Sequence, residues 1–205
     1  MTMKELQRHT MVGPSPLPPI DDALRAEAAT KPGEWIIYAD PWLRPGVTPP
    51  PFSVQGGYWV NEHGVIADHR INPGYQPSPG RTGGWKFVTG LELALWRVVN
   101  GFNTIGDLAD ALAAEPNVLV YAQYEGDTTI SMFGDRERPG GSILALCTSA
   151  QFCTWPHHHP IPGHVALSVA NGTPGARVHF NPGTELSLGL LPGAEFAALA
   201  KKAAG

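Results

Sequence analysis

The sequence predicts an α+β fold, in which a mixed or antiparallel sheet is joined by many loops and a few short helices. Glycine and proline supply 24 and 21 of the 205 residues, and both interrupt long helices. The apolar fraction is 42% and the charged fraction only 16%, which is typical of a chain with a packed core rather than a disordered acidic one. Short strands connected by turns therefore fit this composition better than long helices.

Residues that cap helices and open turns predict the elements of the first half. Acidic residues begin a short helix over 21–30, where they favour the positive N-terminal end. The short apolar run 35–41 is rich in β-formers and predicts a buried strand. Segments 52–60 and 65–71 predict a hairpin, because Gly64 between them can take the positive φ that its loop requires.

Two helices, a group of strands and a last helix are predicted for the second half. The apolar spacing over 89–99 fits a helical stripe, and Thr104 with Asp107 forms a capping box that begins the second helix. The last helix begins after Pro192. The predicted strands are 117–123, 128–133, 142–148, 176–180 and 185–190. Residues 164–169 fit either a strand or a short helix.

These elements divide the chain into three parts. We expect a flexible proline-rich tail over 1–20, a hairpin-rich subdomain over 21–85 and an α/β subdomain over 86–205. The Pro- and Gly-rich segment that follows the hairpin cannot form regular structure, which places the boundary in the loop at 80–90. One continuous sheet through both halves is the alternative.

Charge and hydropathy restrict the compartment and the class of partner. Fourteen Lys and Arg residues oppose 18 Asp and Glu, and there is no basic block, so the net charge of −4 disfavours nucleic-acid binding. No apolar run reaches the roughly 18 residues of a membrane span. Residues 11–19 form a polyproline-like segment where a secretory signal would have its apolar core. We therefore expect a cytoplasmic protein with no nucleic-acid partner and no membrane span.

A run of histidines is the most conspicuous group of metal-ligand residues. Imidazoles bind zinc well, and His157 and His159 could converge from a strand with His164 on one ion. The prolines within and around this run instead predict a stiff, solvated loop, so we expect no metal and no cofactor. Cys147 and Cys153 fit neither a CxxC motif nor a four-ligand zinc framework, which favours free thiols over a disulfide.

Aromatic residues in loops point to binding rather than catalysis. The sequence has no GxSxG, GxGxxG or GxxxxGK[ST] motif, and we expect no catalytic residue and no enzyme. Most of the six tryptophans are expected in the core. Trp and Tyr dominate interface hot spots, so we assign Trp42, Trp59, Tyr75 and Trp85 to partner binding. Of these, Trp42, Tyr75 and Trp85 are expected to be exposed, because they lie in loops.

A series of motifs in the first half resembles a known family. In chain order it contains W, DPW, PPP, GxW, a hairpin Gly and NPxYxPSP, as in the small type VII secretion system-associated proteins of actinobacteria. The second half is similar to the SseB-like domain, with a strand that ends in TS and a later strand that ends in NP. Together the two matches cover about residues 30–190.

The resemblance implies a non-enzymatic accessory or adaptor protein that binds a protein partner beside a type VII secretion system. The partner would be a secretion component, a secreted substrate or a toxin. Two alternatives stay open on the sequence. One is an immunity protein that neutralises a cognate secreted toxin, and the other is a metal-dependent enzyme built on His157, His159 and His164.

Overall fold

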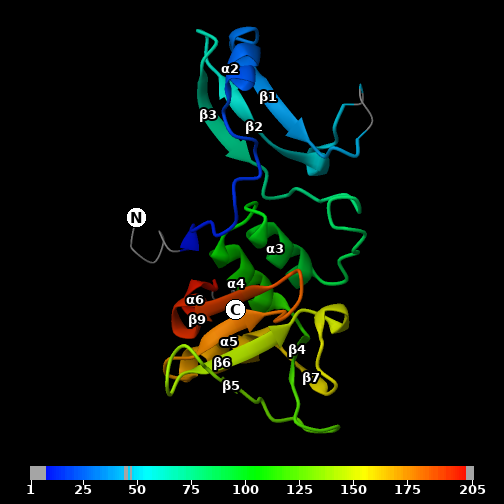
Figure 1. The fold of residues 1–205 in the computed structure, drawn as a ribbon, viewed down its shortest axis with the longest axis vertical. Coiled ribbons are helices and arrows are strands. Elements are labelled where there is room, and N and C mark those ends of the chain that lie inside the picture. The colour runs from blue at the N-terminus through cyan, green and yellow to red at the C-terminus, as the bar shows by residue number, and fades with distance from the viewer. Residues whose placement is uncertain (1–7, 44–45, 47, 202–205) are drawn as a thin grey trace. The chain divides into compact units, whose positions relative to one another are not determined.

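The chain folds into two compact units, each described by itself (Figure 1). The computed structural model describes residues 8–43, 46 and 48–201. Unit 2 comprises Gly13–Lys86 and Asn100–Phe102, and unit 1 comprises Met1–Val12, Phe87–Val99 and Asn103–Gly205. The short helices and the mixed and antiparallel strands confirm the α+β class. No helix among the described residues has the length and apolar character needed to cross a membrane.

Unit 2 is a three-stranded antiparallel sheet with one helix packed on it. Its strand order is β1-β2-β3, and a 3-10 turn precedes β2. The elements are α2 (Asp22–Ala29), β1 (Trp35–Ala39), η1 (Pro51–Ser53), β2 (Val54–Val60) and β3 (Ile66–Ile71). The carboxylate of Asp21 accepts a hydrogen bond from the Leu24 amide at 2.8 Å, which caps α2 as predicted.

The core of unit 2 lies between α2 and one face of the sheet. Alternate strand residues point to this face, because side chains in a strand alternate between two sides. The buried members are Leu17, Leu24, Ala28, Ile36, Tyr58 and Val60.

Part of the proline-rich segment belongs to this core. Leu17 is only 4% exposed, and the Tyr58 hydroxyl donates a hydrogen bond to the Pro18 carbonyl at 2.6 Å. The prediction of a flexible tail over 1–20 is therefore wrong for this stretch, because the core takes up the one large apolar side chain among the prolines. Residues 1–7 of the predicted tail lie outside the described residues.

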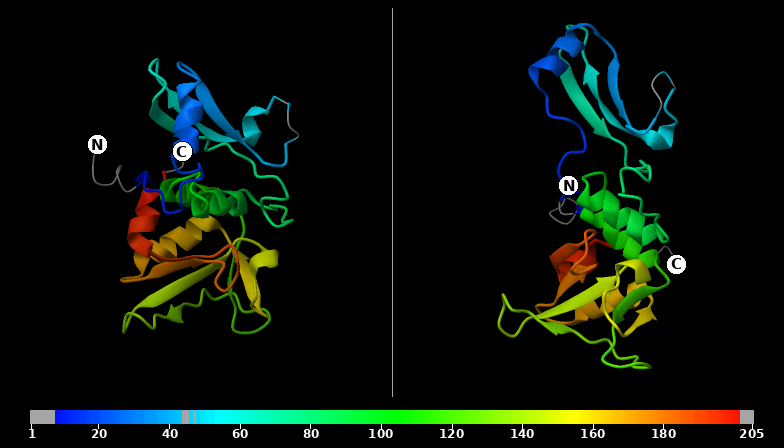
Figure 2. Two further views of the ribbon diagram at one scale, coloured as in Figure 1. Left: turned by 45° about the horizontal axis from the view of Figure 1, so that its top comes forward. Right: turned by 45° about the vertical axis from the view of Figure 1, so that its right-hand side comes forward.

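Unit 1 is a mixed sheet with helices on one side (Figures 1 and 2). The strand order is β7-β4-β6-β8-β9, with β5 paired to β6, and β6 and β8 are parallel. The strands are β4 (Val118–Tyr121), β5 (Phe133–Gly134), β6 (Ser142–Cys147), β7 (His158–Ile161), β8 (Arg177–Phe180) and β9 (Leu188–Pro192). The helices are α3 (Gly90–Val99), α4 (Ile105–Ala114), α5 (Gly163–Gly172) and α6 (Gly193–Leu199), with a 3-10 turn η2 (Ala150–Phe152).

The helices bury one face of this sheet. Leu144 and Leu146 of β6 lie opposite Val178 and Phe180 of β8, and all four side chains are fully buried. The ring of Phe180 meets the ring of Phe196 on α6 edge to face, with centroids 5.8 Å apart. Period-2 alternation along the two strands thus supplies the apolar layer on which the helices pack.

In three segments of unit 1, the structure either differs from the prediction or shows which of two predicted elements forms. Only Phe133 of the predicted strand 128–133 is in a strand, and residues 164–169 belong to α5. The segment His158–Ile161 forms β7, so the prediction of a loop there is wrong. Because β7 pairs with β4 alone, it is an edge strand, where the missing N–H of Pro160 can face away from the sheet.

A buried polar pair joins the ends of the two parallel strands. The Thr148 amide donates to Asn181 Oδ1 at 2.8 Å, and Asn181 Nδ2 donates to Thr148 Oγ1 at 3.1 Å. Asn181 has a φ of 45°, in the left-handed region that asparagine tolerates better than most residues. The TS and NP sequences that follow these two strands are therefore in direct contact.

Replacing Asn181 with Ala is expected to lower the free energy of unfolding by about 2–3 kcal/mol, because buried polar groups of Thr148 lose their partner. Urea denaturation of the full chain followed by circular dichroism measures this loss. The matched control is Asn171→Ala on the exposed face of α5, for which we expect a change within about 0.5 kcal/mol. Equal effects of the two substitutions would contradict a structural role for the pair.

Candidate functional site

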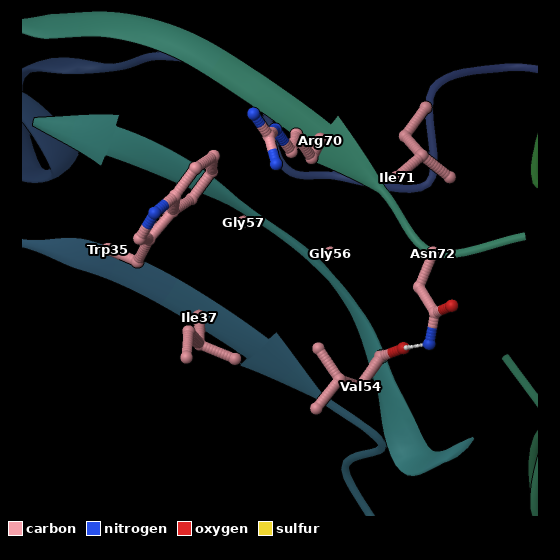
Figure 3. Close-up of a pocket in the computed structure, with 8 residues that line it drawn as sticks. All are labelled: Trp35, Ile37, Val54, Gly56, Gly57, Arg70, Ile71 and Asn72. Atoms are coloured by element: carbon pink, nitrogen blue, oxygen red, sulfur yellow. Dashed lines mark hydrogen bonds between the residues drawn. The ribbon is translucent and has the colours of Figure 1, made fainter. Parts of the chain in front are cut away.

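The second face of the unit 2 sheet has two tryptophans and is not packed against α2. The register aligns Trp35 with Trp59, and in the next row it aligns Ile37, Gly57 and Arg70. These five residues lie on the same side of the sheet, opposite to the core residues. We call them the open face, and Figure 3 draws all of them except Trp59. Ile37 is 56% exposed there, which is unusual for a large apolar residue in a strand.

A hollow of about 240 Å³ lies in the open face, with glycine at its floor (Figure 3). A Cβ atom on Gly57 would lie 2.6 Å from the Ile36 carbonyl oxygen of β1, so the close approach of the strands requires glycine. The row between Ile37 and Arg70 therefore has no side chain at its centre. The lining residues are Trp35, Ile37, Val54, Gly56, Gly57, Arg70, Ile71 and Asn72.

Aromatic and cationic groups border this hollow. The Trp35 and Trp59 rings are tilted against each other with centroids 5.6 Å apart. The guanidinium carbon of Arg70 lies 5.5 Å from the centroid of the Trp35 ring, a cation–π contact. On the other side of the hollow, Asn72 Nδ2 donates to the Val54 carbonyl at 2.7 Å, at the start of β2 (Figure 3). The open face thus combines apolar area with the positive charge of Arg70 and, in register with Trp59, the carboxylate of Asp68.

The carboxylate of Asp40 connects two loops of unit 2 that are far apart in sequence. It accepts hydrogen bonds from the Tyr75 hydroxyl at 2.6 Å, the Ser78 amide at 2.9 Å, the Ser78 hydroxyl at 2.8 Å and the Trp42 amide at 3.0 Å. Asp40 itself is buried. The DPW motif and the NPxYxPSP motif therefore meet at one charge, and we call these four residues the Asp40 hub.

The hub shifts the ionisation of both acidic groups in it. Burial acts to raise the pKa of Asp40, but the hydrogen bonds from Tyr75, Ser78 and Trp42 outweigh it and hold that pKa below its usual value. Burial and the hydrogen bond to Asp40 raise the pKa of Tyr75. At neutral pH the hub therefore contains a carboxylate and a neutral phenol.

The hub presents Trp42 at the surface. Trp42 is 70% exposed and Phe52 is 53% exposed, and together with Pro77 they border a hollow of about 260 Å³. The Trp42 ring lies against Gly80, where any Cβ atom would collide with it. We call Trp42, Phe52 and Pro77 the Trp42 patch. A close ring contact with Gly80 on one side leaves the other side of the indole open.

The structure places the four predicted partner-binding residues in different environments. Trp42 is exposed, Trp59 lies partly exposed on the open face, and Trp85 is partly exposed in its loop. The expectation that Tyr75 is exposed is wrong: its exposure is 0%, its ring stacks on Phe102 at 4.6 Å, and its hydroxyl is bound by Asp40.

The sequence reasoning missed Trp35 as a site residue. It lies in β1 directly opposite Trp59, with Gly57 two residues before that partner. The sequence signal for Trp35 was the alternation along the two strands, which puts tryptophan and glycine on the same side of the sheet. This signal could not be interpreted without the pairing register of β1 and β2, because a shift of one residue would put Trp35 in the core.

The histidine run does not form a metal site in the described part of the chain. No group of three or more His, Cys, Asp or Glu among the described residues is placed to hold an ion. His159 lies in β7 opposite Val120, and both of its ring nitrogens are buried without a hydrogen-bond partner. His164 lies on α5, and the His157 carbonyl accepts a hydrogen bond from the Ala122 amide at 3.1 Å.

A larger hollow of about 820 Å³ lies in unit 1, but its central charge is already paired. Arg177 is buried there and forms ion pairs with Asp135 at 2.6 Å and with Glu137 at 3.0 Å. A cation held by two carboxylates offers little to an anionic ligand. Nearby, burial lowers the pKa of His179, whose Nε2 is 3.0 Å from Ser187 Oγ. The open face and the Trp42 patch are therefore the better candidate sites.

Replacing Asp40 with Asn is expected to lower the free energy of unfolding by about 2–3 kcal/mol at pH 7, because hydrogen bonds to a charged acceptor are lost. The folded-state pKa of Asp40 is depressed, so its stabilisation is complete above the unfolded value of about 3.9 and is lost as pH falls below it. The difference between wild type and Asp40→Asn in urea denaturation should therefore shrink from pH 5 towards pH 2.

The matched control for this experiment is Tyr75→Phe, which removes one donor and keeps the carboxylate. We expect it to cost about 1 kcal/mol and to retain the pH dependence of wild type. A difference between wild type and Asp40→Asn that stays constant over the pH range would show that the charge of Asp40 does not matter.

Comparison with known proteins adds no relative. No protein-family model matches this chain, and no curated protein and no solved structure is significantly similar to it. The resemblance drawn from the motifs thus stays a prediction, and the open face and the Trp42 patch have to be interpreted from their own chemistry.

Proposed function

We propose that the chain is a non-enzymatic, cytoplasmic accessory or adaptor protein of a type VII secretion system, and that it binds a protein partner through unit 2. The observation that carries this proposal is the exposure of Trp42 at 70% on a loop held by the buried Asp40 carboxylate. Large aromatic side chains that are ordered and uncovered are typical of interface hot spots. Phe52 and Pro77 beside Trp42 extend the apolar contact area.

The identity of the hub residues supports the association with secretion. Asp40, Tyr75 and Ser78 are all members of the motif series that resembles type VII secretion system-associated proteins. In this fold, these residues hold the backbone of Trp42 through the Asp40 carboxylate. We therefore interpret the DPW and NPxYxPSP motifs together as the support of a partner-binding loop. The partner class stays a secretion component, a secreted substrate or a toxin.

Trp42→Ala tests the proposal in the native cell. The tagged wild-type chain is expected to co-purify with a type VII secretion component or a secreted substrate, and Trp42→Ala should reduce that recovery about tenfold or more, because hot-spot tryptophans contribute at least about 2 kcal/mol. Recovery is quantified by mass spectrometry against the bait.

The matched control is Tyr124→Ala, which removes an exposed aromatic side chain from unit 1 and should leave recovery unchanged. If no secretion component or substrate is recovered with wild type, the proposal is wrong. It is equally wrong if Trp42→Ala and wild type recover the same amount.

A further inference from the structure

The hollow in the open face is smaller than the usual site for a drug-sized ligand. Its volume is about 240 Å³, whereas sites for drug-sized ligands have about 300–1,000 Å³. Ile37 and Trp35 line the hollow, and the face continues past Trp35 to the ring of Trp59. Such a shape fits one or two side chains of a longer chain that runs across the sheet. This shape favours a polypeptide segment as the occupant.

The polar groups of the open face are mainly donors. Within the described residues, neither the Trp35 nor the Trp59 indole N–H has a hydrogen-bond partner, and no carboxylate pairs with Arg70. Asp68 also lies on this face, in register with Trp59, and its carboxylate accepts a hydrogen bond from the His69 amide at 2.8 Å. The two indoles and Arg70 are matched by a segment that supplies carbonyl or carboxylate acceptors and apolar groups.

Proline-rich segments have this chemistry. Proline has a carbonyl but no N–H, its ring is apolar, and the polyproline II helix leaves its carbonyls without internal partners. Grooves lined by aromatic residues bind such segments, because their conformation is formed in advance and costs little entropy. We propose that the open face binds an extended proline-rich segment of the partner protein, with an acidic residue of that segment at Arg70. This rests on the proposed function and names the chemistry of the partner.

Two other occupants fit the open face less well. A strand added to the free edge of β1 or β3 would bind through backbone groups and would make no use of Trp59 or of the hollow. A second copy of this chain could offer its own proline-rich segment 14–19. That segment is already used in unit 2, since Leu17 lies in the core and the Pro18 carbonyl is bound by Tyr58.

The test titrates the full chain with a short synthetic proline-rich peptide that contains one glutamate. Two control peptides have alanine in place of the prolines, or glutamine in place of the glutamate. Two-dimensional NMR of the indole N–H groups locates binding, because each tryptophan gives its own signal. We expect the Trp35 and Trp59 signals to shift and the Trp42 signal to stay. The alanine peptide should cause no shift, and the glutamine peptide should bind more weakly.

Substitutions then identify the contacts. Trp35→Ala should weaken binding about tenfold or more, and Arg70→Gln should remove the preference for the glutamate peptide over the glutamine peptide. The matched control Tyr124→Ala in unit 1 should bind the peptide as wild type does. Circular dichroism verifies folding, and if Trp35→Ala is unfolded, Arg70→Gln and the Trp59 signal decide the outcome.

The proposal is overturned if neither indole signal shifts at millimolar peptide, if the alanine peptide binds equally well, or if both substitutions leave binding unchanged. Shifts of Trp35 and Trp59 that grow with protein concentration in the absence of peptide would assign the face to a second copy instead. Trp42-dependent recovery of a secretion partner would persist in these cases, which separates this failure from failure of the proposed function.

Discussion

The buried carboxylate of Asp40 is the interaction on which the surface of unit 2 depends. A charge removed from water is tolerated only where donors surround it, and here the donors come from Tyr75, Ser78 and the backbone of Trp42. Each donor lies in a loop that has no regular structure of its own. The carboxylate therefore takes the place of a sheet or helix in joining these residues, and it binds the Trp42 amide although the Trp42 ring is exposed.

The two faces of the unit 2 sheet differ because successive side chains of a strand point to opposite sides. Residues such as Ile36 and Tyr58 point towards α2 and form the core, while their neighbours Trp35 and Gly57 point away. Glycine at position 57 is imposed by the close approach of β1, and the same absence of a side chain makes the hollow. A backbone constraint thus creates a recess beside Trp35 and Arg70.

Local sequence patterns were sufficient for most elements. The cap at Asp21 and the capping box at Thr104 are contacts between near neighbours in the chain, so they could be predicted without knowing the fold. The strand His158–Ile161 could not, because its prolines argue against a strand until the chain is known to lie at a sheet edge. Position in the sheet is a tertiary property.

For the candidate site, the sequence by itself determined that aromatic residues stand in loops among glycine and proline, and that Trp42 would be exposed. Only the tertiary structure decided that Tyr75 is buried on Asp40 and that Trp35 faces Trp59 beside Arg70. The physical reason is distance along the chain. Asp40 and Tyr75 are joined by a hydrogen bond between residues 35 positions apart, and no local periodicity encodes such a contact.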